Sequence, residues 1–275
     1  MNVLVTGGNG FIGSAVVDLL RAVGHDVEIF DRTSGLDIRD RSDVIASVYQ
    51  KDVVIHLAGI LGTDELFDEV YDALSINVVG AINVLEGCVE HGAKYVGITM
   101  LPVFPSIYTA TKVAAGRFAT AYHHTHGVSV THVRAFNVYG PGQAHGRGHP
   151  RKIIPAFSVE GWRNEPMLIW GDGEQMVDLI HVDDVARVFV DALSAPGNDE
   201  TIDAGTCVGL TVNEVADFVL EITGSTAGVE HRPMRRGEIP TKVVATGEGW
   251  VHLSQVPRFD RLQLMKTILA YRSYE

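Results

Sequence analysis

The sequence has few cysteines and fewer basic than acidic residues, and both shortages exclude classes of protein. Cys88 and Cys207 are the two cysteines among 275 residues, and their spacing gives neither a disulfide framework nor a zinc ribbon. The 22 Lys and Arg residues against 34 Asp and Glu residues give a net charge of −12. A general nucleic-acid or anionic-membrane binder is therefore not expected, and an anionic ligand must be held by local groups.

The sequence also lacks a basic amino-terminal region, a signal-like apolar stretch and a transmembrane run. Residues 2–5 already have the apolar pattern of a strand. The two isolated cysteines favour a reducing compartment. We therefore expect a cytoplasmic protein with no nucleic-acid partner and no membrane partner.

Short apolar segments alternate with longer segments of helical period over the first two hundred residues, as in βαβ units that form a parallel sheet. The predicted strands are residues 3–6, 26–30, 53–57, 95–99, 130–136 and 201–204. The predicted helices are residues 11–22, 42–49, 66–91 and 108–126, and a capping box of Thr211 and Glu214 starts another that continues to Ile222. The sequence therefore predicts an α/β fold with a Rossmann-type doubly wound parallel sheet.

Residues 139–173 and 224–275 break this rhythm, and each stretch carries a basic cluster. We expect a smaller, discontinuous C-terminal substrate domain made of residues 139–173 and 206–275. Residues 1–138 and 174–205 then form the Rossmann domain. Because ligands of doubly wound sheets bind beyond the carboxyl ends of the strands, the active site is expected at the seam between the domains.

A glycine-rich segment lies between the first strand and the first helix, which is the context that a dinucleotide fingerprint requires. Gly7, Gly10 and Gly13 permit positive φ and bring bare backbone close to a pyrophosphate. The exposed amides at the positive helix end, where Phe11 and Ile12 lie, attract an anion without a lysine. The pattern predicts an NAD site. The alternative is a tight turn that binds no ligand.

Asp31 closes the second strand, eighteen residues after Gly13, where a carboxylate accepts hydrogen bonds from the adenosine ribose. A carboxylate also repels a 2′-phosphate, which favours NAD over NADP, although Arg32 is positioned to soften this discrimination. The alternative is that Asp31 is a turn residue at a strand end.

Two further segments are expected along the dinucleotide. Asp37 and Ile38 are placed to meet the adenine, while Leu57, Ala58 and Gly59, at the end of the third strand, are placed to line the cofactor.

Tyr108 and Lys112 are four residues apart in a predicted helix and therefore share one face. A tyrosine with a pKa near 10 is a poor base at neutral pH. One ammonium at about 4 Å contributes on the order of 4 kcal/mol at an effective dielectric constant near 20, and the oxidised nicotinamide adds positive charge. We therefore expect Tyr108 to act as a general base. The alternative is a solvated helix face.

The glycine segment of residues 6–13, taken with residues 108–112, resembles the extended short-chain dehydrogenases/reductases of the NAD-dependent epimerase/dehydratase family, which act on nucleotide sugars. Residues 134–143 and residues 171–186 are similar to later segments of that family. The resemblance covers nearly the whole chain. It implies tightly held NAD and a homodimer packed through the helices near residues 76–91 and 108–126.

The resemblance also implies roles for individual residues. Tyr108 would take the proton of a sugar hydroxyl while hydride passes to the nicotinamide, and Lys112 would also bind the nicotinamide ribose. Phe136 would lie near the nicotinamide, and Asn137 would contact the sugar or its diphosphate. Thr99 is the candidate for the hydroxyl that binds the reacting oxygen.

Ser106 is the alternative to Thr99. Dehydratases of the family have Asp and Glu directly after this threonine, whereas Met100 and Leu101 stand here. Neither side chain transfers a proton, so epimerisation is favoured over elimination of water.

The arginine that the family places two residues after the 171–175 segment is Val177 in this chain. The cations that could replace it are Arg147, Arg151 and Lys152 in one cluster and Arg232, Arg235 and Arg236 in the other. We expect Arg151 or Lys152 to compensate for Val177, and Arg236 best matches the family's late phosphate-binding arginine. The alternative is a solvated basic surface.

These features together predict an NAD-dependent nucleotide-sugar epimerase that works through a transient keto sugar. The alternatives are a nucleotide-sugar or keto-sugar dehydrogenase, reductase or dehydratase of the same superfamily, and an NAD-binding sensor without catalysis. His123, His124 and His126 end the helix of Tyr108, where cations suit the negative end, so no metal site is expected.

Overall fold

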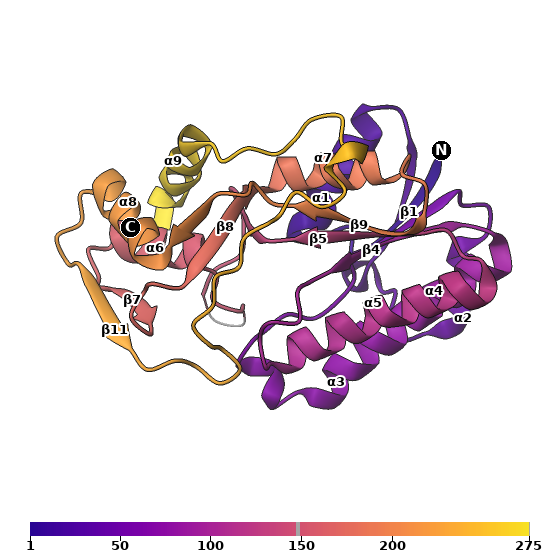
Figure 1. The fold of residues 1–275 in the computed structure, drawn as a ribbon, viewed down its shortest axis with the longest axis horizontal. Coiled ribbons are helices and arrows are strands. Elements are labelled where there is room, and N and C mark those ends of the chain that lie inside the picture. The colour runs from indigo at the N-terminus through magenta and orange to yellow at the C-terminus, as the bar shows by residue number, and fades with distance from the viewer. Residues whose placement is uncertain (147–148, 275) are drawn as a thin grey trace.

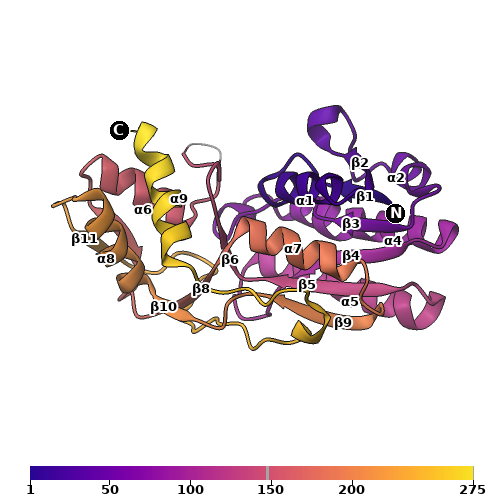
Figure 2. The ribbon, with the colours of Figure 1, turned by 90° about the horizontal axis from the view of Figure 1, so that it is seen from above.

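A large α/β part and a smaller part lie side by side in the molecule (Figures 1 and 2). The computed structural model describes residues 1–146 and 149–274. The amino terminus belongs to the large part and the carboxyl terminus to the smaller one (Figure 1).

One six-stranded parallel sheet forms the centre of the large part. Its strands, in spatial order, are β2 (Asp26–Phe30), β1 (Asn2–Thr6), β3 (Val53–His56), β4 (Lys94–Thr99), β5 (Val130–Ala135) and β9 (Asn198–Ala204). Every neighbouring pair is parallel. The strand order reverses at β1, because β2 pairs with one of its edges and β3 with the other. In such sheets the ligand crevice lies outside this reversal, at the carboxyl ends of the strands.

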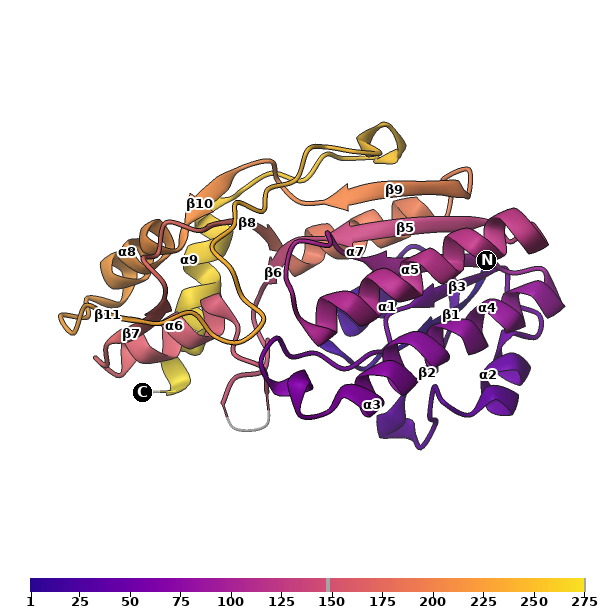
Figure 3. The same cartoon turned by 60° about the horizontal axis from the view of Figure 1, so that its bottom comes forward.

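Helices cover both faces of the sheet (Figure 3). Helices α1 (Phe11–Ala22) and α7 (Val182–Ala192) pack together on one face, and α2 (Arg41–Val48), α4 (Gly80–His91) and α5 (Ile107–His126) cover the other. Alternate strand residues enter different cores: Val3 and Val5 face one, and Leu4 faces the other. Burial on both faces explains the nearly continuous apolar strands. The predicted α/β class and doubly wound sheet are confirmed.

The single helix predicted over residues 66–91 is wrong. A 3₁₀ turn, Glu65–Phe67, precedes a short helix α3 (Val70–Leu74), which continues through a π-helical segment, Ser75–Val79, into α4. The π segment contains Asn77, whose fully buried side chain is hydrogen bonded outside its own helix. Such π segments are frequent at functional sites. Further 3₁₀ turns lie at Arg32–Ser34, Trp250–His252 and Tyr271–Tyr274.

The smaller part contains two short sheets and helices α6 (Ile153–Trp162), α8 (Val212–Thr223) and α9 (Arg261–Ala270). One sheet has the order β10 (Gly209–Thr211), β8 (Met176–His181) and β6 (Asn137–Tyr139), and the other joins β11 (Val229–Arg232) to β7 (Met167–Trp170). The predicted capping box at the start of α8 is confirmed. Strand β8 was expected with the Rossmann domain but pairs within the small sheet, whereas α7 and β9 of the same stretch do join the large part.

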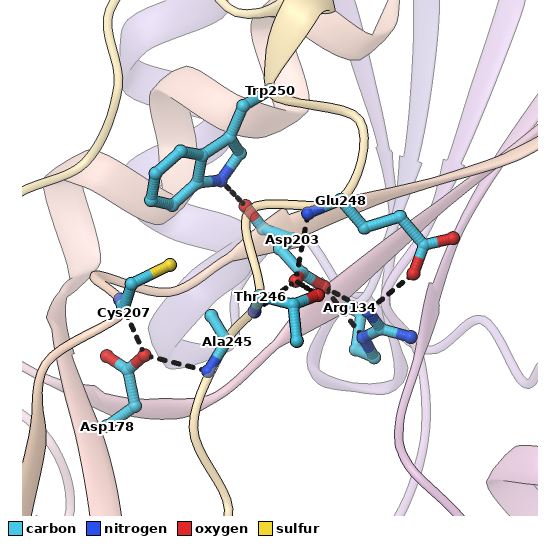
Figure 4. Close-up of polar contacts among 8 residues, drawn as sticks. All are labelled: Arg134, Asp178, Asp203, Cys207, Ala245, Thr246, Glu248 and Trp250. Atoms are coloured by element: carbon cyan, nitrogen blue, oxygen red, sulfur yellow. Dashed lines mark hydrogen bonds and ion pairs between the residues drawn. The ribbon is translucent and has the colours of Figure 1, made fainter.

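The late segment of residues 241–256 crosses back from the smaller part to β9 (Figures 2 and 4). The buried carboxylate of Asp203 accepts hydrogen bonds from the amides of Thr246 and Glu248 and from Nε of Arg134 at 2.7 Å. The indole of Trp250 donates to the Asp203 carbonyl at 2.9 Å. Although this segment was expected wholly in the substrate domain, it therefore binds the two parts together.

The stretch Val70–His91 has the length and apolar composition of a helix that could cross a membrane. In this protein 56% of its most apolar window is buried. The buried side of α4 packs against α2 and α5. This contact makes it a core helix of the large part.

Candidate functional site

The turn between β1 and α1 is built so tightly that side chains are excluded from it. Gly7 has φ +72°, and an added Cβ there would lie 2.7 Å from the amide nitrogen of Ala58. An added Cβ on Gly13 would lie 2.1 Å from the Gly7 carbonyl oxygen. The cap residue Gly10 offers no side chain to the first-turn amides, and the first turn has no acidic residue. These amides are therefore available to an anion, and the turn fits the pyrophosphate of a dinucleotide.

Asp31 lies at the end of β2, beside this turn. Its Oδ2 accepts from the Asn9 amide at 3.1 Å, and its Oδ1 accepts from the amide and hydroxyl of Thr33 at 2.9 and 2.8 Å. Asp31 is thus a turn residue and also a carboxylate at the edge of the large cavity that begins at the glycine turn. Arg32 lines the same cavity.

The next predicted cofactor residues follow β2 and β3. Asp37 forms an ion pair with Arg39 at 2.6 Å. The hydrogen bonds from Arg39 hold the pKa of the Asp37 carboxyl below its usual value. Ile38 is buried, and its carbonyl accepts from Nδ2 of Asn83 at 2.9 Å. After β3, the Ala58 amide donates to the Thr6 hydroxyl at 3.2 Å.

One large cavity, of about 1640 Å³, runs from the glycine turn to the smaller part. Most residues predicted for the site line it: Gly7, Gly10, Phe11, Ile12, Gly13, Asp31, Arg32, Asp37, Ile38, Leu57, Ala58, Gly59, Thr99, Tyr108, Lys112, Phe136, Asn137, Arg151 and Lys152. Ser106 and Arg236 are not among its lining residues. Arg147 lies outside the described residues.

Tyr108 and Lys112 lie one turn apart at the start of α5 and both face the cavity. Burial raises the pKa of Tyr108 to about 12 and lowers the pKa of Lys112 to about 8. The raised pKa of Tyr108 comes from the loss of water around the phenol. Ionisation of Tyr108 near neutral pH requires additional positive charge, such as that of an oxidised nicotinamide.

The two candidate hydroxyls differ in their surroundings. Ser106 is the buried N-cap of α5: its Oγ accepts from the Thr109 amide at 3.1 Å and donates to the Thr109 hydroxyl at 3.0 Å. Its hydroxyl therefore caps the amino-terminal end of α5. Thr99 lines the cavity, but its Oγ1 would lie 3.1 Å from a Cβ added to Gly116, two turns beyond Tyr108.

Asn77 is a site-supporting residue that the sequence patterns did not reveal. Its Oδ1 accepts from the Ile60 amide at 2.9 Å, and its Nδ2 donates to the Ile60 carbonyl and the Thr111 hydroxyl, each at 3.1 Å. A Cβ added to Gly59 would contact the Asn77 side chain and would lie 3.9 Å from Nζ of Lys112. Asn77 thus holds the loop after β3 against the helix of Tyr108. The available signal was a polar residue within the otherwise apolar residues 76–79.

Phe136 and Asn137 occupy the crossing from β5 to β6 and line the cavity. The Phe136 ring packs on Gly205, because an added Cβ there would lie 2.8 Å from its Cδ2. Asp178 accepts from the Cys207 and Ala245 amides at 2.9 and 3.0 Å (Figure 4). This buried carboxylate therefore fixes the backbone that supports Phe136.

Cationic side chains gather around Trp170 at the other end of the cavity. The guanidinium carbons of Arg235 and Arg151 lie 4.4 and 5.0 Å from the indole centroid. Arg151 also pairs with Glu160 at 2.6 Å, and Arg235 pairs with Glu238. Trp170 lines the cavity together with both arginines.

Lys152 and Val177 line this same end of the cavity. Burial lowers the pKa of Lys152, and the carboxylate of Glu65 opposes that change. Val177 contributes only hydrocarbon there.

Arg236, predicted as a phosphate ligand, is instead an exposed residue. Its Nε donates to Asp64 at 2.6 Å and its Nη2 to Asp68 at 3.1 Å, so two carboxylates hold it outside the cavity. Arg235 is the residue of this pair that faces the cavity. Within residues 1–146 and 149–274, no group of three or more His, Cys, Asp or Glu side chains is arranged to hold a metal ion.

Comparison with known proteins agrees with this geometry. The NAD dependent epimerase/dehydratase family matches residues 3–100 and 102–205. A putative UDP-glucose 4-epimerase of Methanocaldococcus jannaschii is 32% identical, with 86% of this chain and 87% of the relative covered. A dTDP-glucose 4,6-dehydratase of Streptomyces niveus is 29% identical over 86% of this chain and 82% of the relative.

Solved structures extend the similarity to both parts of the molecule. The UDP-glucose 4-epimerase of Thermus thermophilus, in complex with NAD, superposes with a TM-score of 0.86. The two sequences are 25% identical, and the alignment covers 99% of each chain.

Proposed function

Because the chain belongs to the NAD dependent epimerase/dehydratase family, we propose that it is a nucleotide-sugar epimerase that acts through a transient keto sugar. It is an NAD-dependent enzyme. The observation that carries the proposal is the pair Tyr108 and Lys112, which faces one cavity with the glycine turn and the cations around Trp170.

NAD supplies the acceptor, and later the donor, of a hydride. The Tyr108 hydroxyl holds the proton that leaves the sugar alcohol and returns it when the alcohol is restored. Lys112 would bind the ribose of the nicotinamide, and its positive charge together with that of the oxidised ring would favour the ionised form of Tyr108. The glycine turn would hold the pyrophosphate through backbone amides, and Asp31 would accept hydrogen bonds from the adenosine ribose.

The cationic end of the cavity is suited to a nucleotide diphosphate. Lys152 and Arg235 supply positive charge where Val177 supplies none, and Trp170 adds an aromatic face. Asn137 contacts the sugar or its diphosphate. Met100 and Leu101 follow Thr99 and transfer no protons, which supports epimerisation over elimination of water.

We also propose that the enzyme forms a cytoplasmic homodimer through the helices near residues 76–91 and 108–126. Large apolar side chains on or just before these helices are exposed, with Tyr71 87% exposed and Val89 and Phe118 more than 40% exposed. Sedimentation analysis tests the dimer, and a monomer at micromolar concentration would contradict it.

The enzymatic proposal is tested with purified protein and a panel of UDP-, dTDP-, GDP- and CDP-sugars, with products resolved by NMR. An epimerase carries NAD through purification and converts one sugar to its epimer without net reduction of the cofactor. Net consumption of added cofactor indicates a reductase, and a deoxygenated keto product indicates a dehydratase. Tight NAD binding without conversion of any sugar of the panel, and without reduction of the bound cofactor by any of them, indicates a sensor.

A further inference from the structure

The segment of the smaller part that follows β11 reaches across to the large part (Figures 1 and 3). We call its residues 233–240 the strap. Both ends of the strap are anchored in the smaller part: the Arg232 carbonyl accepts from the Gly171 amide at 2.7 Å, and the Thr241 carbonyl accepts from the Met176 amide at 2.9 Å. The middle of the strap is therefore the portion that meets the large part.

The strap separates the cavity from solvent. Its residues that line the cavity are Met234, Arg235, Glu238 and Ile239. Arg236 lies between them in the chain but does not line the cavity, and its side chain is 55% exposed. Neighbouring residues of the strap thus face opposite ways, as in a wall with a cavity on one side and water on the other.

Side chains hold this wall against the residues that follow β3. The Arg236 guanidinium pairs with Asp64 at 2.6 Å and with Asp68 at 3.1 Å. Its carbon also lies 5.4 Å from the centroid of the Phe67 ring. We call the two ion pairs of Arg236 the latch.

Gly237, the next residue, rests on the amino-terminal end of α5. Its φ is +73°, and an added Cβ would lie 2.8 Å from Cε2 of Phe67 and 2.9 Å from Cβ of Ser106. Ser106 caps the helix whose first turn contains Tyr108. The latch therefore closes the cavity wall directly beside the proposed reacting end.

The strap can leave the large part without disrupting a helix or a sheet. Within residues 1–146 and 149–274, no backbone hydrogen bond joins the strap to the large part. Segments held by few backbone bonds and by exposed ion pairs open at little cost in free energy. We propose that the strap is a gate, and that the latch between Arg236 and the two aspartates must open for a ligand to enter or leave the cavity. Only the identity of that ligand rests on the function proposed above.

Rate constants of ligand exchange test the gate. UDP, dTDP, GDP and CDP are mixed with the NAD-containing enzyme, and stopped-flow tryptophan fluorescence follows binding and displacement. Arg236→Ala should raise the association and dissociation rate constants together by about threefold or more and leave the affinity within about twofold, because a weaker latch opens more often in both states. Arg232→Ala is the matched control, because Arg232 is 51% exposed and pairs with Glu230 inside its own part. It should change neither rate constant.

The partners of the latch give a second comparison. The double variant Asp64→Asn with Asp68→Asn should reproduce the faster exchange, and Arg236→Ala should add nothing in that background. Unchanged rate constants in Arg236→Ala, or additive effects of the two sets of substitutions, would overturn the proposal.

A covalent lock tests the closed state. Asp64→Cys and Arg236→Cys are combined with Cys207→Ser and joined by a short bis-maleimide, while Cys88 is buried. The double-cysteine protein should exchange nucleotide rapidly before crosslinking and at least about tenfold more slowly after it. Mass spectrometry verifies the crosslink. Equally rapid exchange in the crosslinked protein would show that ligands use another entrance and would overturn the gate.

A thiol in the cavity reports on the gate without a nucleotide. In a Cys207→Ser background, the reaction of Val177→Cys with a maleimide should be about threefold faster when Arg236→Ala is added. An unchanged reaction rate would overturn the gate. Failure of all four nucleotides to bind would instead contradict the proposed nucleotide-sugar function, and latch-dependent exchange without any epimer from the sugar panel would contradict the epimerase alone.

Discussion

Arg235 and Arg236 are consecutive residues, yet their guanidinium groups have different surroundings. Arg235 lies 4.4 Å from the Trp170 ring centroid inside the cavity. Arg236 bonds Asp64 at 2.6 Å on the exterior. One of these two cations is thus available to a ligand in the cavity, and the other joins the segment after β11 to the residues that follow β3.

This relationship predicts different effects of two matched substitutions. Arg235→Ala should weaken nucleotide-sugar binding about tenfold, because it removes a charge-assisted contact. Arg236→Ala should change affinity by less than about twofold, because exposed ion pairs contribute little. Calorimetric titration measures both. A larger loss in Arg236→Ala would restore it as the phosphate ligand.

Tyr108→Phe should reduce turnover at least about 100-fold, because general acid–base transfer typically contributes that factor or more. The glycine turn is untouched, so NAD binding should remain within about twofold. Product formation is followed by NMR, and bound NAD is quantified after denaturation. Undiminished turnover would exclude Tyr108 as the proton carrier.

Lys112→Met should make the protein more stable near neutral pH while it abolishes turnover. The pKa of Lys112 falls from 10.5 to about 8 in the folded protein, which corresponds to a cost of about 3 kcal/mol. This cost is full below pH 8 and is relieved as the pH rises from 8 to 10.5, where the unfolded chain binds more protons than the folded one.

Denaturant unfolding of both proteins at pH 7 and pH 10 measures this difference. The stability gained by Lys112→Met should be largest at pH 7 and shrink at pH 10. A gain that does not change with pH would show that burial of the ammonium is not its source.

His56 should make the enzyme sensitive to acid. Its Nδ1 lies 2.8 Å from the Thr6 hydroxyl, and burial, assisted by the charge of Lys112, lowers its pKa from 6.5 to about 3. Between these values the unfolded chain binds a proton that the folded chain does not, so stability falls as the pH drops below 6.5.

The free energy of unfolding should therefore lose about 2 kcal/mol between pH 7 and pH 5 from this group. His56→Phe should lose correspondingly less over the same interval, whatever its absolute stability. Urea titrations at the two pH values give the comparison, and parallel losses in the two proteins would exclude His56 as the cause.

Local sequence spacing was sufficient for the features that depend on one element. The i, i+4 spacing placed Tyr108 and Lys112 on one helix face. The succession of a strand, a glycine-rich turn and a helix located Gly7 and Gly13. Ser106 shows the limit of this reasoning. Ser106 was a candidate for the hydroxyl that binds the reacting oxygen of the substrate, but this hydroxyl accepts from the first-turn amide of Thr109.

The sequence by itself determined the alternation of strands and helices and the residue types of the cofactor turn, because these follow from short-range backbone geometry and periodic burial. The tertiary structure decided that Asn77 joins Ile60 to Thr111 and that Arg235 faces the cavity. It also decided that Asp203 draws the late segment back to the sheet. These contacts join residues distant in the chain, and their partners are chosen by packing and by the need to satisfy buried polar groups.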